Sequence, residues 1–198
     1  MKIPLSFYQS NNVVFLARSL LGKSLITYID GKLTGGIITE TEAYAGKNDR
    51  ASHAYGGRRT KQTEVMYQSG GISYVYYCYG VHYLFNVVTG KQDTPHAVLI
   101  RAISPTVGLK EILKRRKIKS FTENIANGPG KLSKVLGITL VQNGISLISN
   151  SIWLEDNGFE TQTNDILESK RIGIDYAGED AELYYRFILK TKKNAPLL

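Results

Sequence analysis

The chain has 198 residues, 42% of them hydrophobic, which is enough to build one large buried core. Lysine and arginine number 25 against 17 acidic residues, and the net charge of +8 favours a polyanionic partner, with nucleic acid ahead of an anionic membrane surface. The single cysteine, Cys78, excludes an intrachain disulfide, and no apolar run approaches the roughly 18 residues that a membrane helix needs.

The first half of the chain is predicted to form one helix followed by strands and a loop. Apolar residues at helical spacing predict a helix over 9–22, which Gly22 would end. The segment 45–71 is rich in glycine and in basic and small polar residues, and we expect a long irregular basic loop there. Strands are predicted, with a turn at Asp30-Gly31 between the first two, at 24–30, 33–44, 72–79, 81–89 and 96–103.

The second half is predicted to contain two helices and several short strands. Ser104-Pro105 should begin a helix that runs to about Lys117, and a shorter helix should follow 127–129 and end near Gly137. Strands are expected at 145–149, 151–155 and 184–191. The predicted fold class is α+β, as a single domain with a curved, mostly antiparallel β-sheet flanked by α-helices and the long basic loop.

The sequence Glu-Thr-Glu-Ala-Tyr at 40–44 is the strongest candidate for chemistry. Alternation along a strand places Glu40, Glu42 and Tyr44 on one face. A carboxylate beside an aromatic ring suits the activation of water against a stacked planar substrate. The alternative is a surface acid close to an ordinary tyrosine.

Arg101 lies in the otherwise apolar strand 97–103. A buried guanidinium needs a carboxylate or several acceptors, because an unpaired buried charge is very costly. Glu40 and Glu42 are the obvious partners, and the pair would be either part of a functional site or a structural ion pair.

Tyrosines and basic residues supply candidate contacts with nucleic acid. Tyr79 is expected at a hairpin tip, where an exposed ring suits insertion into a base stack, although a tyrosine that caps the sheet explains the pattern equally well. The loop 46–61 and the outward face of helix 106–117 suit phosphate contact, or are only solvated. The segment 127–131 precedes a helix and suits a backbone phosphate.

The composition argues against a metal centre. His53, His82 and His96 are scattered, and with one cysteine they cannot supply a typical zinc site or a four-cysteine cluster. His53 in isolation is better explained as a structural histidine. The N-terminal sequence has no apolar signal segment, so we expect no export signal and a cytoplasmic location.

The motifs together resemble the alkyladenine, or type II 3-methyladenine, DNA glycosylase family. They occur in family order from about residue 7 to 190, and the ordered set is much more specific than any one of its members. The matching segments are 17–23, 40–44, 51–53, 56–58, Met66, 74–80, 85–87, 98–102, 127–132 and 171–174.

The resemblance implies one DNA glycosylase domain over 1–198 that binds double-stranded DNA containing damaged purines, flips the damaged base out and hydrolyses its N-glycosidic bond. Glu42 would deprotonate the attacking water, which Arg101 would help to hold. Asn86 would line the pocket and help to reject guanine, and Tyr79 would fill the gap left in the duplex. The implied contacts with the flipped base are Tyr44, His53, Tyr76, Asn86, Ala43 and Ala51, and those with the DNA are Tyr79, Arg58, Met66 and Lys131.

No lysine replaces Glu42 in the motif, so we expect a monofunctional enzyme. We also expect a monomer that uses no metal or cofactor and does not contact a membrane. The chain departs from the family at Tyr184-Tyr185, where Pro-Trp is usual, and at Cys78, commonly another apolar residue. Both differences bear on substrate range. Two alternatives remain: a non-catalytic protein that stacks bases on tyrosines, and a phosphodiester-cleaving enzyme, which should need a divalent ion.

Overall fold

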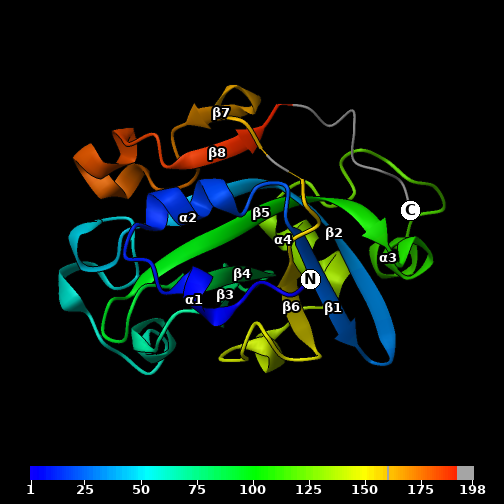
Figure 1. Ribbon diagram of the computed structural model, residues 1–198, viewed down its shortest axis with the longest axis horizontal. Coiled ribbons are helices and arrows are strands. Elements are labelled where there is room, and N and C mark those ends of the chain that lie inside the picture. Colours follow the sequence, from blue (N-terminus) through cyan, green and yellow to red (C-terminus); the bar gives the residue numbers. More distant parts are fainter. Residues whose placement is uncertain (160, 191–198) are drawn as a thin grey trace.

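A curled antiparallel β-sheet forms the centre of the molecule, in a computed structural model that describes residues 1–159 and 161–190 (Figure 1). Its strands lie in the order β3 (Ile72–Cys78), β4 (His82–Thr89), β5 (His96–Val107), β2 (Lys32–Tyr44), β1 (Ser24–Ile29) and β6 (Ile152–Glu155). Two further strands complete the sheet: β8 (Arg186–Leu189) pairs with β2, and β7 (Ile166–Ser169) pairs with β8. The fold class is α+β, as predicted.

Helices cover both faces of the sheet. In Figure 1, α1 (Leu5–Tyr8) and α2 (Val13–Ser19) lie on the near side, and α4 (Pro129–Leu136) lies behind, with α3 (Leu109–Arg116) beside it. Apolar residues from α2, from α4 and from the strands between them join in one buried cluster. The remaining short helices are of the 3₁₀ type: η1 (Gly46–Asn48), η2 (Tyr55–Gly57), η3 (Glu64–Tyr67), η4 (Leu140–Gln142), η5 (Thr163–Asp165) and η6 (Asp175–Glu182).

The long strand β2 determines where the functional groups lie. One edge of β2 pairs with β5, and the other edge pairs first with β1 and then, at residues 40–42, with β8. Because helices also pack against β2 on the faces of the sheet, residues 34–43 are buried without the alternation of a strand that has one solvated face. As a result, the acidic motif at 40–44 lies inside the protein, between β5 and β8, and is not at a rim.

The predicted helix over 9–22 is shorter than expected at both ends. The Asn12 side chain accepts a hydrogen bond from the backbone N–H of Phe15, which caps α2 and fixes its start at Val13. The separate turn α1 precedes it, and it was not predicted. The helix 129–136 agrees with its prediction, with Pro129 in its first turn and Gly137 after its end.

The prediction that Ser104-Pro105 begins a helix was wrong. Strand β5 continues through both residues to Val107, and α3 begins only at Leu109, after Gly108 has turned the chain in the left-handed region. Pro105 is tolerated because the pairing with β2 shifts register close to it, opposite Gly36. Leu109 is 43% exposed, while Arg115 turns inward to Thr34 and Val135.

The C-terminal third contains less strand than predicted. Residues 145–149 make only isolated bridges, Ser146 with Ile72 and Ile148 with Trp153, because each contacts a different neighbour in turn. The strand expected at 151–155 is β6. Of the strand expected at 184–191, only 186–189 form β8, and residue 191 lies outside the described residues. Strand β7 was missed. In the described ranges, every helix is too short or too polar to cross a membrane.

Candidate active site

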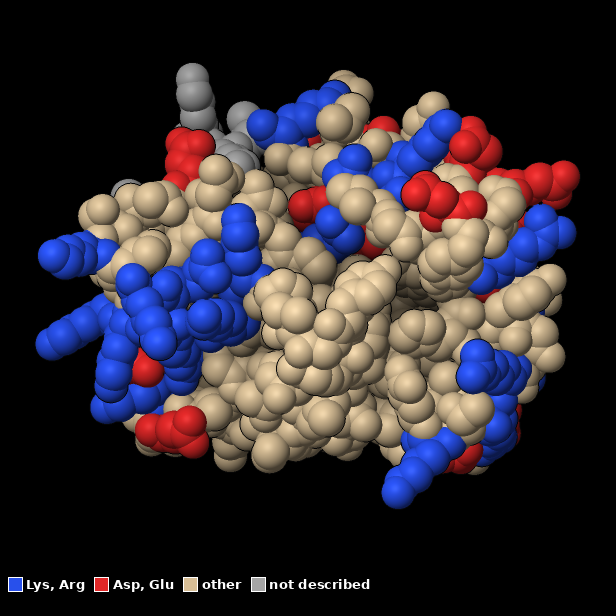
Figure 2. All heavy atoms as spheres, turned by 180° about the vertical axis from the view of Figure 1, so that it is seen from behind, with Lys and Arg blue, Asp and Glu red and all other residues tan. Residues whose placement is uncertain are grey.

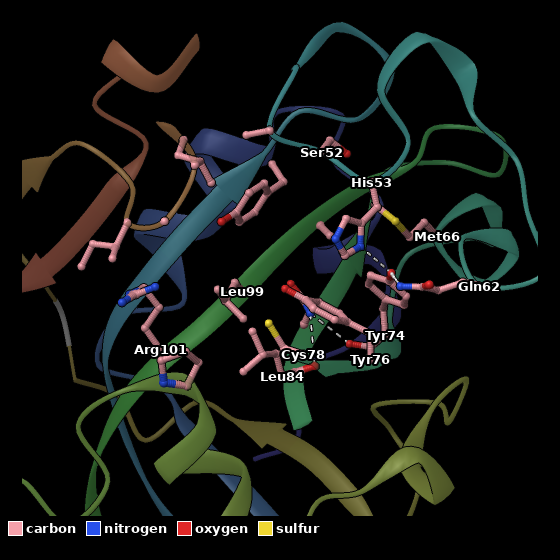
Figure 3. A pocket seen from close by; sticks show the side chains of 18 of the residues that line it. Ser52, His53, Gln62, Met66, Tyr74, Tyr76, Cys78, Leu84, Leu99 and Arg101 are labelled. Carbon is pink, nitrogen blue, oxygen red and sulfur yellow. Dashed lines mark hydrogen bonds between the residues drawn. The ribbon is translucent and has the colours of Figure 1, made fainter. Parts of the chain in front are cut away.

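A cavity of about 490 Å³ opens beside the middle of the sheet. Its walls come from the end of β2 at Tyr44, from β3, β4 and β5, from the start of α4 at Pro129, and from the segments 51–66 and 172–176. Figure 3 shows His53 and Met66 at one end of the cavity, Tyr74 and Tyr76 beside them on β3, and Arg101 at the opposite end. One end is thus aromatic and the other carries charge.

Glu42 lies immediately behind the charged end. Its side chain is 0% exposed and is itself not part of the cavity wall. Its Oε2 accepts a hydrogen bond from the Tyr44 hydroxyl at 2.8 Å, and its Oε1 accepts one from the backbone N–H of Ile172 at 2.9 Å. Both partners line the cavity, so the carboxylate is one contact away from the space inside.

Arg101 connects Glu42 with a second buried acid. Its Nη1 lies 3.2 Å from Oε1 of Glu42, and its Nε donates to Oε1 of Glu40 at 2.9 Å. The partners predicted for this arginine are therefore confirmed. Leu99 and Ala97 line the cavity together with Arg101, as alternation along β5 requires.

Burial raises the pKa of the Glu42 carboxyl above its ordinary value, and the nearby Glu40 carboxylate adds to the rise. The Arg101 guanidinium and the hydrogen bonds from Ile172 and Tyr44 oppose that rise, because they stabilise the charged form. Burial and the Glu42 carboxylate together hold the pKa of Tyr44 well above its ordinary value, so Tyr44 remains a hydroxyl donor. A raised pKa on a buried acid beside a cavity is typical of a functional group.

The aromatic end is organised by hydrogen bonds between side chains. His53 Nδ1 lies 2.7 Å from the Tyr74 hydroxyl, to which the Gln62 side chain also donates at 3.3 Å. Burial, with a smaller effect of Arg58, lowers the pKa of His53, so its ring is neutral at neutral pH. The Tyr76 ring stands 4.6 Å from that of His53, centroid to centroid. These rings form a rigid, mainly uncharged wall.

The segment 172–176 forms a wall of the cavity for which no role was predicted, although 171–174 was among the matching motifs. Ile172, Gly173, Ile174 and Tyr176 all line the cavity. Arg171 anchors the segment: its side chain is 0% exposed and forms ion-paired hydrogen bonds of 2.5 and 2.9 Å with Asp49. Its guanidinium also lies 4.9 Å from the centre of the Tyr44 ring.

The other residues predicted to contact a base are not all in the cavity. Asn86 and Ala51 line it, and Asn86 donates to the backbone carbonyl of Tyr74 at 3.2 Å. Ala43 does not: its side chain belongs to the buried core, and its carbonyl accepts from Arg171. Met66, predicted to contact DNA, is 2% exposed and packs in the cavity wall, so only an occupant of the cavity can reach it. The cause is the packing of η3 onto the sheet.

The remaining residues predicted to contact DNA are exposed, and Tyr79 among them also borders the cavity. Tyr79 is 90% exposed at the turn between β3 and β4, with φ 51°, and Arg58 and Lys131 are also exposed. Figure 2 shows the face opposite to the view of Figure 1: a dense group of Lys and Arg covers the region of α3, a broad uncharged area occupies the middle, and a hollow lies beside it. The exposed Tyr79 ring and basic side chains therefore lie on the surface of the molecule, while the Glu42 carboxylate is buried inside it.

Comparison with known proteins identifies relatives of this architecture. The sequence model of one family, described as methylpurine-DNA glycosylase (MPG), matches residues 6–193. A protein of Chlamydia felis is 48% identical over 97% of this chain and 98% of its own length, and one of Clostridium perfringens strain 13 is 43% identical over 98% of both chains. Each bears the name "Putative 3-methyladenine DNA glycosylase".

The chain belongs to the methylpurine-DNA glycosylase family. Membership makes it a DNA glycosylase that processes alkylated bases, with DNA as its substrate and DNA repair as its setting. The resemblance inferred from the ordered motifs is confirmed, and the match extends over nearly the whole chain.

The donor set around the cavity does not resemble a metal centre. In the described part of the chain, no group of three or more His, Cys, Asp or Glu side chains is arranged to hold an ion. Of the described residues that line the cavity, none is a lysine, so an amine nucleophile is not at hand there.

Proposed function

We propose that the protein is a monofunctional purine-DNA glycosylase, in which an alkylated purine leaves the duplex, enters the cavity and is released by a water that Glu42 activates. The observation that carries the proposal is the position of the Glu42 carboxylate, fully buried and bonded to two residues of an aromatic cavity wall. The substrate named for the relatives, 3-methyladenine, is the first candidate.

The cavity suits an alkylated purine in its charge. Such a base is positively charged, and tyrosine faces and a carboxylate attract a cation that has left water. Tyr44, Tyr76 and the neutral His53 provide those faces, with Glu42 behind them. The Asn86 amide donates to the carbonyl of Tyr74 and lies in the cavity wall, which supports the proposal that it rejects guanine through the exocyclic amino group of that base.

The chemical step needs an acceptor for one proton. As the water oxygen bonds to C1′ of the sugar, the bond from C1′ to the purine nitrogen breaks, its electron pair leaves with the base, and a proton of the water passes to the carboxylate. Oε2 of Glu42 accepts only the Tyr44 hydroxyl among the described residues, and a carboxylate oxygen has two lone pairs, so one remains for water. Burial raises the pKa of Glu42, and the nearby Arg101 charge opposes that rise, which favours the ionised carboxylate that a general base must be.

The test of this role is Glu42→Gln in single-turnover excision from a duplex with one 3-methyladenine. A general base contributes roughly 10²–10⁴-fold, and we expect a loss of that size with lesion binding retained. Reactions in EDTA, with the released base identified by mass spectrometry, separate hydrolysis of the base from metal-dependent strand cleavage. Normal excision by the variant would refute the assigned role, and binding without base release by the unaltered protein would favour the non-catalytic alternative.

Base flipping is tested at the tip of the β3–β4 hairpin. Tyr79 is the exposed ring beside the cavity mouth, where it can occupy the gap that an extruded base leaves. Tyr79→Ser should weaken binding to a lesion duplex by about 1–3 kcal/mol, the size of one stacking contact. Release from single-stranded substrate should change less, since no gap forms there; equal effects on both substrates would contradict the wedge.

A further inference from the structure

We propose that Glu40 and Arg186 are positioning residues that form a balanced charge pair, which holds Arg101 toward Glu42 and sets the acid side of the pH range of the reaction. The inference rests on the proposed role of Glu42. It assigns a function to two residues that would not themselves touch the substrate.

The pair is built into the sheet. Oε1 of Glu40 accepts from Nε of Arg101 at 2.9 Å and from Nη1 of Arg186 at 3.0 Å, so one oxygen lies between two guanidinium groups. Strand β8 brings Arg186 opposite Glu42 in the register with β2, and Glu40 opposite Ile188. The Arg186 side chain is held in turn by the carbonyl of Lys170 and the Ser169 hydroxyl. Its position is therefore fixed from both sides.

The bond to Glu40 fixes the direction of Arg101. Because Nε is occupied by Glu40, the guanidinium turns its Nη1 toward Glu42, at 3.2 Å, while the side chain borders the cavity. A planar guanidinium held at one edge has little freedom about its last torsions. Loss of Glu40 would free this edge, whereas the isosteric change to glutamine keeps an oxygen there and removes only the charge.

The ionisable groups that face Glu42 come from every element around it. Glu40 and Tyr44 belong to β2, Arg101 to β5 and Tyr76 to β3; Arg171 and the Ile172 N–H follow β7, and Arg186 lies on β8. Among them, Glu40 alone is a second carboxylate, and its charge favours the protonated form of Glu42. Arg186 offsets that charge at 3.0 Å.

Glu40 and Arg186 therefore have opposite effects on the pH at which Glu42 takes up a proton. Glu40→Gln removes a negative charge near Glu42, so Glu42 should stay ionised to lower pH. Arg186→Gln leaves Glu40 with less compensation, so Glu42 should take up its proton at higher pH. A general base works only when deprotonated, so the first change extends activity toward acid and the second narrows it.

The experiment measures single-turnover excision from one lesion duplex between pH 5 and 9, as the ratio of the rate at pH 5.5 to the plateau rate. We expect Glu40→Gln to raise this ratio about three- to tenfold and Arg186→Gln to lower it by a similar factor, since one unit of pKa is a tenfold change in the ionised fraction. The double variant should return close to the ratio of the unaltered protein. The plateau rates themselves are left out of the comparison.

Two control variants separate charge from structure. Arg18 also contacts β7 and β8, through an ion pair with Glu168 and the face of Phe187, but it does not face Glu42, so Arg18→Gln should leave the ratio unchanged. Arg186→Lys keeps the charge and should also leave it close to normal. If Arg186→Gln does not fold, Glu40→Gln and Arg186→Lys still decide.

An unchanged ratio in Glu40→Gln, or a shift of both single glutamine variants in the same direction, would overturn the proposal. These outcomes differ from a failure of the proposed function. If Glu42→Gln excises the base normally, the role of Glu42 is wrong, whatever the other variants do. If Glu42→Gln is inactive and the two shifts are missing, only the charge pair is wrong.

Discussion

Two buried arginines, Arg171 and Arg101, lie close to the same aromatic cavity but make different contacts. Arg171 has both Nη atoms on Asp49 and also donates to the carbonyls of Ala43 and Asp180. Its guanidinium lies over the rings of Tyr44 and Tyr185, and its buried Nε has no partner among the residues that the structure describes. Arg171 does not line the cavity.

Arg101 is less completely engaged. It is 9% exposed, it borders the cavity, and its recorded contacts among the described residues use Nε and Nη1, on Glu40 and Glu42. A guanidinium has five donors, so Arg101 has N–H groups left for an occupant of the cavity. The contrast indicates that Arg171 holds segments of the chain together, whereas Arg101 is available to the reaction.

The largest effect is expected from Arg171→Met, which leaves the Asp49 carboxylate buried without its partner. Breaking a buried ion pair by removing one member costs about 3–5 kcal/mol, and we expect a fall of that size in the free energy of unfolding, measured with urea at pH 7. The matched double variant with Asp49→Asn should recover part of it. A loss below about 1 kcal/mol would remove the distinction between the two arginines.

Arg101→Lys should affect activity more than stability. A lysine keeps the charge, but its single ammonium cannot hold Glu40 and Glu42 at the two edges of a fork. We expect the single-turnover rate to fall about 10- to 100-fold, because a small misplacement at the reacting centre has effects of that order. The free energy of unfolding should fall by only about 1–2 kcal/mol. A destabilised variant with full activity per folded molecule would reverse this assignment.

The smallest effect is expected from Tyr44→Phe, a substitution at the residue that lies between the two arginines. The ring remains over Arg171, but the hydroxyl that bonds Glu42 is lost. That bond favours the charged carboxylate, so without it the pKa of Glu42 should rise further and activity should be lost at a higher pH as the solution is acidified. We expect a decrease of about three- to tenfold at pH 5.5 and little change at pH 8.

Tyr185→Phe is the matched control, since Tyr185 also stacks on Arg171 and has no recorded contact with Glu42 among the described residues. The same pH dependence in both variants would mean that the loss of the hydrogen bond from Tyr44 to Glu42 is not its cause.

Local sequence pattern predicted those residues of the candidate site that lie on strands. Alternation brought Glu42 and Tyr44 together, and the burial of a lone guanidinium pointed to Glu40 and Glu42 as the partners of Arg101. The wall at 172–176 and Arg186 lie more than 120 residues along the chain from the acids that they contact. Ile172 donates its N–H to Glu42, and Arg186 donates to Glu40. Nothing in the local sequence specifies such an approach.

The fold shows the same division. Strands β1 to β4, each of which pairs with a neighbour in the chain, lie close to their predicted bounds, because hairpin turns and apolar content are local properties. Errors occur where tertiary pairing decides: β5 runs through Pro105 because β2 continues beside it, and the bridges at 145–149 serve different partners. The fate of Ala43 has the same origin, since burial on both faces of β2 leaves it in the core.

The turn at the tip of the β3–β4 hairpin also has a consequence for natural variation. Tyr79 and Gly80 both have positive φ, 51° and 67°, and the N–H of Val81 closes the turn on the carbonyl of Cys78. Asparagine or glycine suits this backbone better than tyrosine, whose left-handed conformation costs roughly 1–2 kcal/mol. A search for heat-tolerant forms of the protein would therefore tend to select asparagine or glycine at this tip. With the wedge role proposed above for Tyr79, the more stable molecules obtained should bind damaged duplexes less tightly.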